Sequence, residues 1–137
     1  MTAKNAPRVG VLAIQGDYAA HAAALAEAGA EPVEVRKPEE LAGLAGLVLP
    51  GGESTTMLKF LEKQGFFELL KDFCRQKPVF GTCAGVILLA REVRNPTQKS
   101  LGVLDAVVER NAYGRQIDSA IVTSPAGLTE DTVETVF

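Results

Sequence analysis

The stretch Val79-Phe80-Gly81-Thr82-Cys83-Ala84-Gly85-Val86 joins a short apolar segment to a turn of small residues and the start of a helical pattern. The spacing Gly81-x-Cys83-x-Gly85 has the form of a nucleophile elbow, a sharp turn between a strand and a helix that exposes a reactive side chain. Here a thiol stands where the hydrolases that define the motif carry serine. A helix N-terminus also favours the thiolate form of cysteine. Cys83 is therefore a candidate nucleophile.

Short apolar segments and helical patterns alternate along the rest of the chain. Strands are expected at 9–14, 32–36, 47–49, 79–81, 101–109 and 132–137. Helices are expected at 18–28, from Pro38, around 57–61, at 66–74 and at 84–92. Asp17 is the expected N-cap of the first helix and Gly29 its C-terminal stop. A turn is expected at 125–127, in a region where the patterns weaken.

Strands that alternate with helices predict an α/β fold with a mostly parallel central sheet and helices on both faces. Ligands of such sheets bind at the carboxyl ends of the strands. The turns at Gln15-Gly16, Pro50-Gly51-Gly52 and Cys83 each follow an expected strand. All three turns are therefore expected at one edge of the sheet.

The composition describes an ordinary globular chain. Its 137 residues suit one domain, and the net charge of −3 with a pI near 5.2 gives no indication of a nucleic-acid or anionic-membrane partner. Neither a membrane span nor a signal peptide is indicated, so we expect a cytoplasmic protein with reduced thiols. Cys74 and Cys83 lack the spacing of a metal or redox site, and Cys74 falls on the apolar stripe of helix 66–74, where a packing role is expected.

Thiolate chemistry at an amide also needs donors for the developing oxyanion and a base for the thiol proton. The N–H of Ala84 and those of the turn at Gly51 and Gly52 are candidate donors, while Glu53 and Ser54 could bind an amide or amine. The alternative is that the turn is only a tight turn and Ser54 only a helix cap. The one histidine, His21, lies inside the first helix, where a surface or packing role is expected rather than that of a base.

Four motifs in order resemble a known family. They are Gln15-Gly16, Pro50-Gly51-Gly52-Glu53-Ser54-Thr55-Thr56, the elbow around Cys83, and Glu109-Arg110-Asn111-Ala112-Tyr113-Gly114-Arg115-Gln116. Together they resemble the glutaminase subunits of pyridoxal 5′-phosphate synthase, which are class I, triad-type glutamine amidotransferases. The resemblance covers nearly the whole chain and implies a flavodoxin-like class I glutaminase fold for it.

The family implies hydrolysis of L-glutamine to L-glutamate and ammonia through a cysteine thioester. Ammonia then passes to a separate synthase subunit, a (β/α)₈ barrel, which uses it to make the vitamin B6 cofactor. The resemblance implies no cofactor, metal, nucleic acid or membrane for the glutaminase itself. It assigns the nucleophile to Cys83, glutamine binding to Gly52, Glu53, Ser54 and Arg110, and the oxyanion hole to Gly52 and Ala84.

The chain departs from the family pattern at its C-terminal end. Family members continue through an Ile-Arg pair to a late His-Pro-Glu that supplies the base and its carboxylate, whereas this sequence stops at Thr135-Val136-Phe137. We therefore expect residues 1–137 to form a single glutaminase domain that lacks its C-terminal part. The alternative is a binding module that docks on the synthase subunit without turnover. A third reading is another cysteine enzyme of the same fold, such as a chaperone-like or protease-like relative, and the Arg110–Gln116 stretch argues against it.

Overall fold

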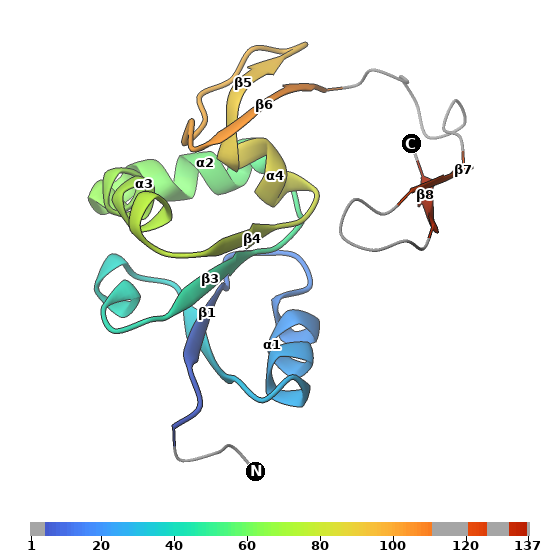
Figure 1. The fold of residues 1–137 in the computed structure, drawn as a ribbon. Coiled ribbons are helices and arrows are strands. Elements are labelled where there is room, and N and C mark those ends of the chain that lie inside the picture. The colour runs from blue at the N-terminus through green and yellow to red at the C-terminus, as the bar shows by residue number, and fades with distance from the viewer. Residues whose placement is uncertain (1–4, 111–120, 126–131, 137) are drawn as a thin grey trace.

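A four-stranded parallel sheet forms the centre of the molecule (Figure 1). The computed structural model describes residues 5–110, 121–125 and 132–136. In the order in which they pair, the strands are β2 (Glu31–Val35), β1 (Arg8–Leu12), β3 (Gly46–Leu49) and β4 (Val79–Gly81). Every neighbouring pair is parallel, so the predicted α/β fold is confirmed.

Helices pack on both faces of this sheet. They are α1 (Tyr18–Glu27), η1 (Pro38–Leu41), α2 (Ser54–Glu62), η2 (Lys63–Gly65), α3 (Phe66–Gln76) and α4 (Ala84–Leu89). Leu49 of β3 lies in the hydrophobic core with side chains from α2, α3 and α4, whereas its neighbour Val48 lies beside Leu25 of α1. Because successive side chains of a strand point to opposite faces, α1 covers one face and the later helices cover the other.

Glycines with positive φ lie at two of the helix ends. Gly29, with φ +95°, follows the C-cap of α1 in the left-handed conformation that glycine tolerates, so the predicted stop is confirmed. Asp17 does occupy the N-cap position of α1, but its side chain makes no capping hydrogen bond there. Gly65, with φ +70°, is the last residue of η2 and the N-cap of α3.

The predicted helix 84–92 is wrong in its last three residues. α4 ends at Leu89, and the chain continues as β5 (Ala90–Arg94), which pairs in parallel with β6 (Leu104–Glu109) in a sheet separate from the central one. The Leu88 carbonyl accepts a hydrogen bond from the Leu101 N–H at 2.6 Å, and the Ala90 carbonyl accepts one from Gly102 at 3.1 Å. A segment distant in sequence therefore satisfies the carbonyls at the end of α4, and a local pattern cannot predict that pairing.

Only some of the later strands lie where the sequence predicts them. β6 begins at Leu104 rather than at residue 101, after Gly102 adopts a left-handed φ of +68°. β7 (Ile121–Pro125) pairs antiparallel with β8 (Thr132–Val136), and β8 confirms the last predicted strand. Pro125 ends β7, which was not predicted, and the rest of the predicted turn at 125–127 lies outside the described residues.

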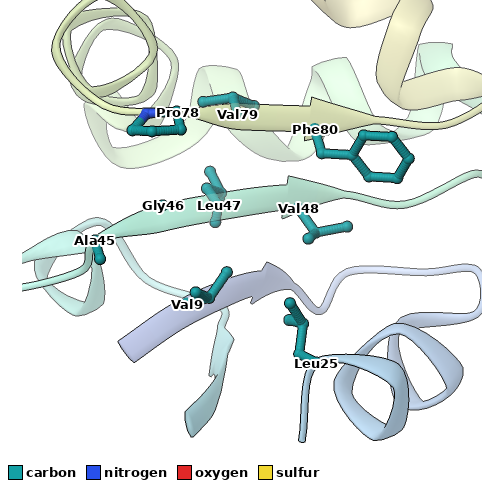
Figure 2. Close-up of a pocket in the computed structure, with 9 residues that line it drawn as sticks. All are labelled: Val9, Leu25, Ala45, Gly46, Leu47, Val48, Pro78, Val79 and Phe80. Atoms are coloured by element: carbon teal, nitrogen blue, oxygen red, sulfur yellow. The ribbon is translucent and has the colours of Figure 1, made fainter. Parts of the chain in front are cut away.

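The sheet face beside α1 is only partly covered. An apolar cavity of about 450 Å³ lies there between Leu25 of α1 and side chains of the three strands β1, β3 and β4, including Val9, Val48 and Phe80 (Figure 2). Phe80 remains 60% exposed. None of the candidate site residues lines this cavity, so the candidate chemistry lies elsewhere, at the ends of the strands. Among the helices of residues 5–110, none has the length and apolar character that a bilayer crossing requires.

Candidate active site

Cys83 lies at the apex of a strained turn between β4 and α4. Its φ of +51° is unusual for a residue with a side chain, and its thiol is exposed. The small residues around it permit this geometry: a Cβ atom on Gly81 would lie 2.8 Å from the Leu89 side chain, and one on Gly85 would collide with the Leu49 backbone carbonyl. A strained, exposed thiol whose turn is held by close glycine contacts has the geometry of the nucleophile elbow that the sequence pattern predicts.

The three turns predicted at one edge of the sheet do meet there. The turn after β3 touches the elbow, because a Cβ atom on Gly51 would lie 3.1 Å from the Cys83 Cβ. The turn after β1 touches the turn after β3, because a Cβ atom on Gly16 would collide with the Gly51 carbonyl oxygen. The backbones therefore approach as closely as glycine allows, and the side-by-side arrangement of the three turns is confirmed.

Gln15 joins the first two turns through its side chain. Its Oε1 accepts a hydrogen bond from the Glu53 backbone N–H at 2.6 Å. Gly52, whose φ is +144°, lies so close that an added Cβ would be 2.6 Å from the same oxygen. Gln15 therefore constrains the conformation of the turn to which Gly52 and Glu53 belong.

Glu53 is the N-cap of α2. Its carboxylate accepts hydrogen bonds from the Thr56 N–H at 2.7 Å, the Thr56 hydroxyl at 2.8 Å and the Thr55 N–H at 3.1 Å. These bonds, those from Thr56 first, lower the pKa of Glu53 from 4.5 to about 2. The cap is thus Glu53 and not Ser54, and Glu53 carries a negative charge at the rim of the site.

Ser54 and Arg110 meet at a third side chain, Gln98. The Gln98 Oε1 accepts a hydrogen bond from Arg110 Nη1 at 2.7 Å and one from the Ser54 hydroxyl at 3.4 Å. Arg110 Nη2 also lies 3.7 Å from Glu53 Oε1, as an ion pair. The Arg110 side chain is only 20% exposed and Ser54 is buried. The structure thus brings Glu53, Ser54 and Arg110 together, as candidate substrate-binding residues require.

The sequence predicted no role for Gln15 or Gln98, although both contact candidate site residues. Gln15 was quoted only as part of a turn and a family motif, and Gln98 only as part of a loop. Neither glutamine has a local signal, because each acts on a residue at least 12 positions away. The contacts follow from the fold and not from spacing along the chain.

The remaining candidates lie at the same edge. Ala84 is buried and begins α4, where backbone N–H groups lack partners within the helix. His21 Nε2 lies 3.5 Å from the Thr82 hydroxyl, one residue before Cys83, so it contacts the elbow without contacting the thiol in any described interaction. Within the described ranges, no three His, Cys, Asp or Glu side chains are grouped to hold a metal ion.

The second cysteine lies apart from this edge. Cys74 of α3 is half-buried against the hydrophobic core, and that burial raises the pKa of its thiol to about 11. A thiol so rarely ionised is a poor nucleophile, in agreement with the packing role predicted for it.

The arrangement suits acyl transfer to a thiol. The exposed Cys83 thiol lies at the start of α4 and against the Gly51 turn, where backbone N–H groups could receive an oxyanion. The Glu53 carboxylate and the Arg110 guanidinium, 3.7 Å apart at the start of α2, are complementary to the charged ends of an amino-acid ligand.

Comparison with known proteins places these features in a family. Residues 11–137 match the model of the SNO glutamine amidotransferase family. A relative in Solibacter usitatus, pyridoxal 5′-phosphate synthase subunit PdxT, is 61% identical over 83% of this chain and 59% of its own length. The PdxT subunit of Koribacter versatilis is 56% identical over 95% of this chain and 67% of its own length. The chain thus spans about three fifths to two thirds of the length of these relatives.

Solved structures agree with this result. A crystal structure of a glutamine amidotransferase is 46% identical, with a TM-score of 0.79 over 94% of this chain and 69% of that one. A putative peptidase E from Listeria monocytogenes is only 16% identical, with a TM-score of 0.59 over 72% of this chain and 63% of that one, and shares the fold alone.

Proposed function

The chain belongs to the SNO glutamine amidotransferase family, and we propose that it acts as the glutaminase subunit of a pyridoxal 5′-phosphate synthase. In this role it hydrolyses L-glutamine to L-glutamate and ammonia. The main support for the proposal is the position of Cys83, which is strained, exposed and packed against the Gly51 turn. Relatives that are 61% and 56% identical carry the name of this subunit, which supports the choice among the amidotransferases.

Cys83 is the proposed nucleophile. Its thiolate attacks the side-chain carbonyl carbon of glutamine, and the carbon–nitrogen bond of the amide breaks as ammonia leaves with an added proton. The resulting γ-glutamyl thioester is hydrolysed by water, which releases glutamate and restores the thiol. The N–H groups of Ala84 and Gly52 are the proposed donors to the oxyanion that forms in each step.

Substrate binding is assigned to the turn after β3 and to Arg110, which follows β6. We propose that Glu53, whose low pKa keeps it anionic, receives the α-amino group of glutamine, while Arg110 receives the α-carboxylate. Gly52 and the buried Ser54 shape the turn on which Glu53 lies. The Arg110–Glu53 ion pair keeps the two charged groups 3.7 Å apart before substrate arrives, so that neither is unpaired in the empty site.

In the part of the chain that the structure describes, no hydrogen bond joins the Cys83 thiol to a proton acceptor. His21 is the one histidine of the sequence, and its imidazole faces Thr82. We propose that a His-Pro-Glu segment, of the kind implied by the family resemblance, supplies the base from outside these residues. Residues 1–137 then form one glutaminase domain that carries the nucleophile and the substrate contacts.

The proposed partner is the (β/α)₈-barrel synthase subunit that consumes the ammonia, and the proposed location is the cytoplasm. Free ammonia is lost to solvent as ammonium unless it passes directly to the next active site. A glutaminase that serves a synthase is therefore expected to work in a complex with it.

Covalent labelling by a chloromethyl ketone analogue of L-glutamine tests the proposal. The Cys83 thiolate should displace chloride from the reagent, and intact mass should show one adduct whose formation saturates with reagent and is prevented by L-glutamine. The variant Cys83→Ala should gain no adduct, whereas Cys74→Ala should behave as the parent. Labelling that is unaffected by glutamine would contradict the proposed substrate.

The same sample separates turnover from binding alone. Glutamine that protects Cys83 but is never hydrolysed, even when the synthase subunit is present, would favour the alternative of a binding module. That alternative is motivated by the position of His21, which has no described contact with the thiol.

A further inference from the structure

We propose that Gln98 is a positioning residue, which aims the Arg110 guanidinium at the α-carboxylate of glutamine. This inference rests on the proposed function, because it gives Arg110 a substrate. The Gln98 Oε1 accepts a hydrogen bond from Arg110 Nη1 at 2.7 Å, the shortest polar contact described for that side chain. Glu53 is more distant, at 3.7 Å from Nη2. Gln98 therefore determines the direction of the guanidinium more closely than Glu53 does.

The orientation of the Gln98 amide follows from its partner. A guanidinium only donates hydrogen bonds, so the atom that faces Arg110 must be the amide oxygen. The same oxygen accepts from the buried Ser54 hydroxyl at 3.4 Å. One oxygen thus joins the first residue of α2 to the residue that follows β6, and both of these residues belong to the candidate glutamine site.

Backbone hydrogen bonds hold Gln98 and Arg110 against the same strand, β5. The Gln98 N–H donates to the Val93 carbonyl at 3.4 Å, and the Arg110 N–H donates to the Arg94 carbonyl at 2.9 Å. Val93 and Arg94 are neighbours in β5, so the two backbones are fixed to adjacent positions. The Gln98–Arg110 contact is therefore formed before substrate arrives, as preorganised binding requires.

The other end of the Gln98 amide reduces what the residue contributes to stability. Its Nε2 is buried and has no hydrogen-bond partner within the described part of the chain. A buried donor without an acceptor destabilises a fold. A side chain of the same length without an amide would avoid that cost, but it would leave Arg110 without the acceptor that orients it.

The test compares variants by the concentration dependence of Cys83 labelling with the glutamine chloromethyl ketone in the natural protein. Gln98→Met keeps the length and removes the acceptor, and it should raise the half-saturating reagent concentration about tenfold, as expected for a lost charge-assisted hydrogen bond. The maximal labelling rate should change little, and so should the melting temperature, because removing the unpaired Nε2 offsets the lost Oε1 hydrogen bonds. Gln98→Glu restores an acceptor and should recover most of the affinity. Thr97→Ala, an exposed neighbour in the same loop, is the matched control.

A double-mutant cycle with Arg110→Ala shows whether Gln98 acts through Arg110. In the Arg110→Ala background, Gln98→Met should cause no further loss of affinity. An equal loss in both backgrounds, or no loss in the parent, would overturn the inference while leaving the proposed function intact. If labelling of the parent does not saturate and glutamine gives no protection, the proposed function fails and this inference fails with it.

Discussion

Gly51 lies directly against Cys83: a Cβ atom added to Gly51 would be 3.1 Å from the Cys83 Cβ and 3.7 Å from its Sγ. The contact arises from the register of the sheet, since Leu49 at the end of β3 pairs with Gly81 at the end of β4. The turns that follow these two strands must therefore leave the sheet side by side. Only a residue without a side chain lets the first turn pass so close to the thiol.

Replacing Gly51 with alanine should therefore damage the site more than the fold. The added methyl group must displace either the turn or the Cys83 side chain, which should slow glutamine-analogue labelling about tenfold or more. Overpacking of this kind costs about 1–3 kcal/mol of folding free energy. Gly46→Ala is the matched control, because its Cβ would meet the Pro78 carbonyl at the same 3.1 Å at the other end of β3. Equal labelling rates for the two variants would contradict the role given to the Gly51 contact.

The pH dependence of stability should report the Glu53 cap. Hydrogen bonds from Thr56 and Thr55 lower the pKa of Glu53 from 4.5 to about 2, so the folded state favours the ionised carboxylate. Its stabilisation is therefore fully present above about pH 4.5 and is lost as the pH falls towards about 2. The melting temperature of Glu53→Gln should lie below that of the parent at about pH 6 and converge with it at about pH 2.

Thermal scans of both proteins across this range make the measurement. Glu68→Gln, at an exposed position in α3, serves as the control for removing one negative charge. A gap between the parent and Glu53→Gln that stays constant with pH would mean that the carboxylate does not cap α2 in solution.

The two cysteines should differ sharply towards iodoacetamide, which does not resemble glutamine. Cys83 is exposed, whereas burial raises the pKa of Cys74 to about 11, so only on the order of one Cys74 thiol in a thousand is ionised at about pH 8. Intact mass should show one rapid adduct in the parent and in Cys74→Ala, and none in Cys83→Ala. Two adducts at similar rates would show that Cys74 is accessible in solution.

The sequence was sufficient for features that depend on nearby residues. The elbow around Cys83, the stop at Gly29 and the parallel sheet all follow from residue types over short windows, and each is present in the structure. The meeting of three turns at one edge was also predictable, because a parallel sheet places the ends of its strands together.

Features that depend on distant partners were not predictable. The pattern 84–92 favours a helix, yet Leu88 and Ala90 bind the segment at residues 101–102 and the chain turns into β5. The sequence around Gln98 likewise predicts a loop, and only the pairing of Gln98 with Val93 of β5 places its side chain beside Arg110. Roles for Glu53 and Arg110 were predicted from the sequence, but none for Gln15 and Gln98, which bind them.

The central claim is that Cys83 is the nucleophile of a glutaminase, and its most direct test is glutamate release by the natural protein in the presence of its synthase subunit. The parent and Cys74→Ala should release glutamate and ammonia in equal amounts, while Cys83→Ala should release neither above the uncatalysed background. Undiminished release of glutamate by a folded Cys83→Ala variant would contradict the account.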